Sequence, residues 1–287
     1  MNWLETGVNL APHHKQGFVA PNPVLLAGGV IGNGEAYGRG LNTAALGGVV
    51  IGPVMRRSRG GGDAPRMAHI NGGMVLETTL QNRGITTLLK RFAPQWEQLG
   101  CPVIVQIADS QPHDVQTVVN RLNEALFAGI MVSGMELLLP QRIDADAVRH
   151  LIRAARRDAE LPLWVKLPLE NVAEMAQAAV GAGADGLVVA QPPAGAAWAG
   201  DKMVTGALYG PLAFGPMLAA LHNVAALQLD CALLACGGIH TPQQAQQALQ
   251  VGAHAIQLDS AVWVEPGLPE LIVDALTNTT ADSENNR

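Results

Sequence analysis

The sequence has little charge, no basic surplus and no long apolar run. Charged residues make up 15% of the 287 residues, against roughly 25% in an average domain. The formal net charge is -6, so the chain has no positive field to attract nucleic acid. No apolar stretch reaches the about 18 residues that a membrane span requires. These absences exclude nucleic acid and membrane as expected partners and predict a soluble protein.

Two further absences concern location and metal binding. The opening residues, Met1 to Glu5, lack a basic segment followed by an apolar run, so no secretory signal is predicted and we expect a cytoplasmic site of action. Cys101, Cys231 and Cys236 show no C-x-x-C spacing, so we expect buried free thiols and no metal site. With 48% hydrophobic residues and so few charges, much of the surface should be covered by helices or by a second subunit, which favours a homo-oligomer.

Eight apolar runs of strand length punctuate the chain. They are continuous and do not alternate with polar residues, which is typical of parallel strands buried on both faces. The predicted strands are Pro23–Gly29, Gly48–Pro53, Pro102–Ala108, Gly129–Ser133, Pro162–Leu167, Gly186–Ala190, Cys231–Gly238 and Ala255–Ala261.

The segments between these runs have the pattern of helices. Asp114–Ala128 and Asp144–Arg157 each place their apolar residues on one stripe, as amphipathic helices do. Thr241-Pro242 supplies a helix cap and a first-turn proline. Eight strand–helix units in 287 residues predict an α/β fold, a single (β/α)8 barrel domain spanning residues 1–287.

Three segments depart from this repeat. The connections Val54–Gly100 and Gln191–Asp230, which follow strands 2 and 6, are longer than is usual in βα units. Loops of this length often cover functional sites. Residues 277–287 are polar and lack apolar anchors, so we expect a disordered tail there.

The last two predicted strands indicate a phosphate-bearing ligand. Ala235–Ile239 contains Gly237 and Gly238, and Ala255–Ser260 ends in Asp259 and Ser260. Small residues at two successive strand ends leave backbone N–H groups free to hold a phosphate, as the last loops of many such barrels do.

Two polar side chains interrupt apolar strands. Lys166 follows Trp164 and Val165, where an unpaired ammonium would be costly, so we expect either a structural carboxylate partner or an anionic ligand. Gln106 is either a hydrogen-bonded core amide or a contact to the edge of a ligand ring. The segment Met55–Arg66, with four arginines among glycines, is either a solvated loop or an anion clamp that closes over the site.

Several short motifs, in this order, resemble the dihydroorotate dehydrogenase family. The likeness runs from about Asn22 to Leu276, and it rests on the order and spacing of the motifs together. The motifs are Asn22–Gly29, Gly32–Glu35, Pro65-Arg66, Gly72–Met74, Leu80–Asn82, Gly84, Val165–Leu167, Gly210-Pro211, Cys236–Ile239 and Gly252–Gln257.

This resemblance implies a flavoprotein of pyrimidine biosynthesis that binds FMN at the carboxyl ends of the barrel strands. It places Lys166 at the flavin ring. Gln106, from its own position late in a strand, is the other expected cofactor contact. The resemblance implies that Ala27 and Gly28 approach the cofactor with their backbone. The phosphate is then expected among Gly210, Gly237, Gly238, Asp259 and Ser260, and the substrate beside Asn82 and Gln191.

The chain departs from the family pattern at the substrate. Where the family carries a catalytic Cys or Ser between asparagines, this chain has Val132–Leu138, and Glu136 is the candidate proton acceptor. Gly52, Leu76 and Gln191 replace a lysine and two asparagines of the family. Asp259 replaces a glycine beside the phosphate, where a carboxylate would repel a dianion.

Three functions therefore remain as hypotheses. The first is an FMN-dependent oxidoreductase that acts on a CH–CH bond of a small polar substrate, with dihydroorotate as one possibility. The second is a catalytically degenerate relative that binds a ligand or serves in assembly. The third is a flavin-free barrel that acts on a phosphorylated metabolite, because barrels host many chemistries.

Overall fold

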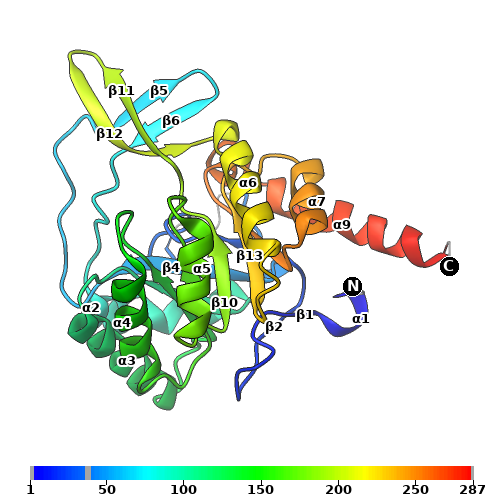
Figure 1. Ribbon diagram of the computed structural model, residues 1–287, viewed down its shortest axis with the longest axis horizontal. Helices are drawn as coiled ribbons and strands as arrows, with labels where there is room; N and C mark the ends of the chain where they lie inside the picture. Colours follow the sequence, from blue (N-terminus) through cyan, green and yellow to red (C-terminus); the bar gives the residue numbers. More distant parts are fainter. Residues whose placement is uncertain (1–2, 36–39, 286–287) are drawn as a thin grey trace.

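The predicted barrel is confirmed. In the computed structural model, which describes residues 3–35 and 40–285, eight parallel strands form a closed barrel (Figure 1). Around the barrel the strands follow the order β10 (Gly186–Val189), β13 (Ala232–Cys236), β14 (Ala255–Leu258), β3 (Val24–Leu26), β4 (Gly48–Val54), β7 (Val103–Ile107), β8 (Gly134–Leu138) and β9 (Leu163–Lys166).

Helices cover the outside of the barrel. The longer ones are α2 (Ile85–Arg91), α3 (Pro112–Phe127), α4 (Ala145–Arg156), α5 (Val172–Gly181), α6 (Phe214–Ala225), α7 (Pro242–Val251) and α9 (Leu268–Asn285). Shorter elements are α1 (Trp3–Thr6), α8 (Ala261–Val264) and the 3-10 turns η1 (Thr43–Ala45), η2 (Ala93–Leu99) and η3 (Pro211–Ala213). Thr241 caps α7 as predicted, because its side chain accepts a hydrogen bond from the Gln244 N–H at 3.2 Å. Within the described ranges, no helix combines the length and the apolarity that crossing a membrane requires.

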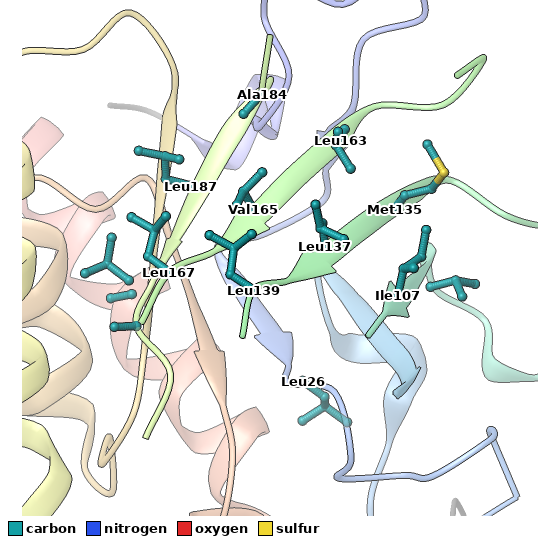
Figure 2. Close-up of a cluster of buried hydrophobic side chains, with 14 of the residues drawn as sticks. Leu26, Ile107, Met135, Leu137, Leu139, Leu163, Val165, Leu167, Ala184 and Leu187 are labelled. Atoms are coloured by element: carbon teal, nitrogen blue, oxygen red, sulfur yellow. The ribbon is translucent and has the colours of Figure 1, made fainter. Parts of the chain in front are cut away.

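Side chains alternate between two cores along each strand. Met135 and Leu137 of β8 belong to the outer cluster between strands and helices, part of which Figure 2 shows. Glu136, between them, points into the barrel. An inner cluster includes Leu25, Val50, Ile104 and Trp164.

The amino-terminal end of the barrel is closed by a hairpin of β1 (Val8–Asn9) and β2 (Val19–Ala20). The Trp164 indole N–H donates to the Leu10 carbonyl at 2.9 Å, and Phe18 packs edge-on against the same indole, with ring centroids 5.0 Å apart. Gly134 and Gly186 flank Trp164, since a Cβ at either glycine would come within 2.2 Å and 2.5 Å of the ring. The site therefore lies at the opposite, carboxyl-terminal end.

The two long connections are folded segments that meet each other. The first contains β5 (Met67–Ile70) and β6 (Gly73–Leu76), and the second contains β11 (Ala194–Ala199) and β12 (Lys202–Tyr209). They form one antiparallel sheet in the order β11-β12-β6-β5, which protrudes at the upper left of Figure 1. Because β4 and β10 lie on opposite sides of the barrel, the β6–β12 pairing joins two opposite sides of its mouth.

Two sequence predictions need correction. The fourth strand is β8, five residues later than the expected 129–133, because Gly129 adopts a left-handed φ of 85° and ends α3 first. Residues 277–285, expected to be disordered, continue α9. In its last turns the hydroxyls of Thr277, Thr279 and Thr280 donate to carbonyls one turn back, at 2.9 Å each. Residues 286–287 lie outside the described residues.

Candidate functional site

A buried polar network crosses the barrel interior near its carboxyl-terminal end. The Lys166 ammonium on β9 donates to the side-chain oxygen Oε1 of Gln257 at 3.0 Å and to the Cys236 sulfur at 3.1 Å. Its Nζ lies 3.9 Å from a carboxylate oxygen of Glu136, and the two side chains are only 5% and 1% exposed. The expected anionic partner of Lys166 is therefore present within the protein itself.

Both oxygens of Glu136 are occupied by amides. Gln106 Nε2 on β7 donates to Oε1 at 2.6 Å, and Gln257 Nε2 on β14 donates to Oε2 at 2.5 Å. The predicted catalytic use of Glu136 assumed a carboxyl group open to the substrate. The structure encloses it among barrel residues, so its geometry is that of a counter-charge to Lys166, and its role as a base stays a prediction.

The network keeps Lys166 charged. Burial alone would lower the pKa of Lys166, but its interactions with Cys236, with the Glu136 carboxylate and with Asp259 outweigh burial and raise it above its ordinary value. Burial raises the pKa of the Cys236 thiol to about 11, so this cysteine remains a neutral thiol at pH 7. Gln257 and Cys236 accept from two of the three N–H donors of the ammonium.

The glycines expected around a cofactor also serve close packing. A Cβ on Gly28 would come 2.6 Å from the Gln106 side chain, and one on Gly210 would come 2.7 Å from the Gly73 Cα. A Cβ on Gly238 would lie 2.2 Å from the Phe214 nitrogen at the start of α6. Ala27 is buried in the inner cluster, and its N–H donates to the Leu258 carbonyl. Their roles as cofactor contacts stay predictions.

The two turns expected to hold a phosphate differ in the donors they offer. The N–H groups of Gly237 and Gly238 have no hydrogen-bond partner within the described residues. The Ser260 N–H, by contrast, donates to the Asp259 carboxylate at 2.6 Å, and the Ser260 hydroxyl lies 3.2 Å from the same oxygen. The first turn therefore offers both glycine N–H groups to an anion, whereas the second turn has its Ser260 N–H already engaged.

Asp259 is buried beside other ionisable groups. It is 6% exposed, and burial raises its pKa, although the charge of Lys166 acts in the opposite direction. Burial also raises the pKa of Tyr209, with a contribution from the Asp259 charge. His240 is another neighbour, and burial lowers its pKa. His240 Nε2 is a buried side-chain nitrogen with no partner in the described part of the chain.

Asn82 and Gln191, expected at the substrate, have their amides engaged in the protein. The Asn82 oxygen accepts the N–H groups of Met55 and Gly84, and its nitrogen donates to the Leu80 carbonyl. The Gln191 nitrogen donates to the carbonyls that follow β8 and end β9, at Leu139 and Lys166, and its oxygen accepts from Gln141. These bonds brace loops and strand ends, so a substrate contact by either residue stays a prediction.

Two cavities open at the barrel mouth. The smaller, about 180 Å³, is lined by Gly28, Gly29, Val30, Pro53, Leu76, Thr78, Leu80, Gln81, Tyr209, Asp259 and Trp263. The larger, about 630 Å³, is lined by Gly32, Asn33, Gly52, Pro53, Ser58, Arg59, Gly60, Gln81, Asn82, Arg83 and Thr87. Pro53 and Gln81 belong to both walls, so the cavities adjoin.

The larger cavity is lined by two arginines and no carboxylate. Arg59 comes from the arginine-rich segment that the sequence singled out as a possible anion clamp. Another arginine of that segment, Arg56, forms an ion pair with Asp114 at 2.7 Å. The segment is therefore partly structural and partly open to a ligand.

Sequence reasoning missed Gln257, Tyr209, His240 and Arg83. Gln257 had a usable signal, since it is a polar residue in an otherwise apolar strand, as Lys166 is. Tyr209 had none, because it reaches the site only through the pairing of β12 with β6. Within the described residues, no group of three or more His, Cys, Asp or Glu side chains is placed to hold a metal ion.

Comparison with known proteins identifies the family. Two similar proteins are the catalytic subunits of dihydroorotate dehydrogenase B (NAD(+)) from Bacillus thuringiensis (strain Al Hakam) and Bacillus cereus (strain AH187). Each is 27% identical over 278 residues, which cover 91% of this chain and 88% of the relative. The family model for dihydroorotate dehydrogenase matches residues 14–279. Since this match spans nearly the whole chain, the protein belongs to the dihydroorotate dehydrogenase family.

Proposed function

We propose that the chain is a flavin-dependent oxidoreductase that acts on a CH–CH bond of a small polar substrate. The observation that carries the proposal is the buried, protonated Lys166 at the carboxyl end of β9, in a barrel of a family whose members bind FMN. A bound flavin supplies the electron acceptor, and a positive charge beside it favours the reduced, anionic ring. Dihydroorotate is the first substrate to test.

The fit to FMN differs between the two ends of the cofactor. At the ring end, the chain offers the partly apolar cavity beside Gly28 and Trp263. The Lys166 ammonium is buried in the barrel and interacts electrostatically with Asp259, which lines this cavity. At the phosphate end, Gly237 and Gly238 offer free N–H groups, but the Asp259 carboxylate occupies the Ser260 N–H. The residues present therefore fit the ring better than the phosphate.

The larger cavity is the proposed substrate site. Arg59 and Arg83 supply guanidinium groups, which bind carboxylates through charge-assisted hydrogen bonds. At about 630 Å³, the cavity falls within the roughly 300–1,000 Å³ typical of small-molecule sites. The shared wall at Pro53 and Gln81 places it next to the smaller cavity, so we infer a small anionic substrate held beside the flavin.

The test is flavin binding followed by anaerobic reduction. The purified chain should bind added flavin, and dihydroorotate should then bleach the flavin absorption in the absence of oxygen. Lys166→Ala should slow this reduction by about 10²-fold, the typical effect of removing one preorganised electrostatic group. Lys90→Ala, which changes an exposed lysine of α2, is the matched control and should leave the rate unchanged. Absence of flavin binding by the unaltered chain overturns the proposal.

A second candidate function is ligand binding without turnover. It is favoured by the hydrogen bonds that engage Glu136, Asn82 and Gln191, three residues expected to handle substrate. In that case a flavin or anionic ligand would bind and raise the Tm, but no tested substrate would reduce a bound flavin. Substrate-dependent reduction that Lys166→Ala abolishes would contradict it.

A further inference from the structure

The turn after the last barrel strand contains a carboxylate, that of Asp259. Asp259 follows β14, and its carboxylate accepts the Ser260 N–H at 2.6 Å while lying 3.2 Å from the Ser260 hydroxyl. These are donors of the kind that bind a phosphate at the last loops of such barrels. A phosphate entering this turn would find one backbone donor already used and a negative charge beside it.

The surroundings of Asp259 fit a retained carboxylate. The side chain is buried, lines the smaller cavity, and interacts electrostatically with the Lys166 ammonium. Asp259 also interacts electrostatically with His240 and with Tyr209. The His240 Nε2 atom is buried and has no hydrogen-bond partner among the described residues. The cavity wall thus carries a buried carboxylate, and His240, which interacts with that carboxylate electrostatically, has an unused polar atom.

We propose that the Asp259 carboxylate takes the place of the ligand's phosphate, so that this barrel binds riboflavin, the flavin without a phosphate, in preference to FMN. This inference rests on the proposed flavin-binding function. The terminal hydroxyl of riboflavin is neutral and can donate a hydrogen bond to a carboxylate. The FMN phosphate can only accept at neutral pH and is repelled by the same group.

The experiment measures dissociation constants of riboflavin and FMN for the full-length chain by quenching of flavin fluorescence. The unaltered chain should bind riboflavin at least tenfold more tightly than FMN. Asp259→Gly, which removes the carboxylate and frees the Ser260 N–H, should shift the ratio toward FMN by at least tenfold, or about 1.4 kcal/mol. Asp259→Asn removes the charge but keeps an acceptor oxygen, and should give a smaller shift in the same direction.

Asp201→Asn is the matched control, because Asp201 is exposed in the turn between β11 and β12, and it should leave the ratio unchanged. The inference is overturned if the unaltered chain binds FMN at least as tightly as riboflavin, or if neither Asp259 variant changes the ratio. Either outcome leaves the flavin proposal standing. If the unaltered chain binds neither flavin, both proposals fall; if it binds riboflavin and only Asp259→Gly binds FMN, the inference is supported.

Discussion

Exchanging Glu136 for glutamine should destabilise the fold far more than the small change of shape suggests. The substitution removes the counter-charge 3.9 Å from the Lys166 ammonium, at a place where both side chains are at most 5% exposed. It also removes an acceptor for one of two hydrogen bonds, because Gln106 and Gln257 each donate to a different oxygen of Glu136. A glutamine has one oxygen, so its own NH2 group would face one of these donors.

Relaxation of this contact is limited by Lys166. If Gln257 turned its amide to accept from the new glutamine, its oxygen would leave the ammonium, to which it is bonded at 3.0 Å. Breaking a buried ion pair on one side typically destabilises a protein by about 3–5 kcal/mol. We therefore expect Glu136→Gln to lower the free energy of unfolding by about that amount at pH 7.

The assay is urea unfolding of four proteins, namely the unaltered chain, Glu136→Gln, Lys166→Met and the double variant. Since the two residues share one network, the effects should be non-additive, with a coupling of about 1–3 kcal/mol. The pKa of Lys166 is raised in the folded state, so its contribution should be complete at neutral pH and decline only above about pH 10. A loss below about 1 kcal/mol for Glu136→Gln, or additive effects, would refute this reasoning.

Three further predictions concern other parts of the molecule. Burial raises the pKa of Asp259, so its ionisation opposes folding at pH values above the unfolded-state pKa near 3.8. Asp259→Asn should therefore raise the Tm more at pH 7 than at pH 4. An equal increase at both pH values, or a lower Tm at pH 7, contradicts this. Gly134→Ala should destabilise the fold by about 1–3 kcal/mol, because the added Cβ meets Trp164 at 2.2 Å, whereas Gly181→Ala, with nothing within 4 Å, should be near neutral in denaturant unfolding. We also propose that the chain self-associates through Trp198 and Met203, which pair across β11 and β12 and are 68% and 52% exposed. Light scattering should show an oligomer for the unaltered chain and a monomer for the double variant Trp198→Ser, Met203→Ser. A monomeric unaltered chain would refute the proposal.

The sequence was sufficient to predict the barrel because its signals are local and repeated. Continuous apolar runs, helix stripes such as Val115–Leu122, and the Thr241 cap each depend on neighbours in the chain. Seven of the eight predicted strands overlap the observed ones. The fourth was displaced because Ile130 to Val132 have strand-like side chains, whereas the φ of Gly129, which ends the preceding helix, depends on three-dimensional context.

The site was less predictable because its decisive contacts are long-range. That Lys166 needs an anionic partner followed from its place in an apolar strand. That this partner is Glu136, held by Gln106 and Gln257, depends on four strands closing into one barrel. The hydrogen bond from the Ser260 N–H to the Asp259 carboxylate is local, but the electrostatic interactions of Asp259 with Tyr209 and Lys166 are long-range.

The sheet over the barrel mouth has a consequence for how a ligand gains entry. Strand β6 belongs to the long connection after β4, and β12 belongs to the long connection after β10. The two strands pair with each other, Leu76 with Ala207 and Met74 with Tyr209. Movement of either connection would therefore move the other as well. Ligand access then depends on one shared sheet and not on two loops that open independently.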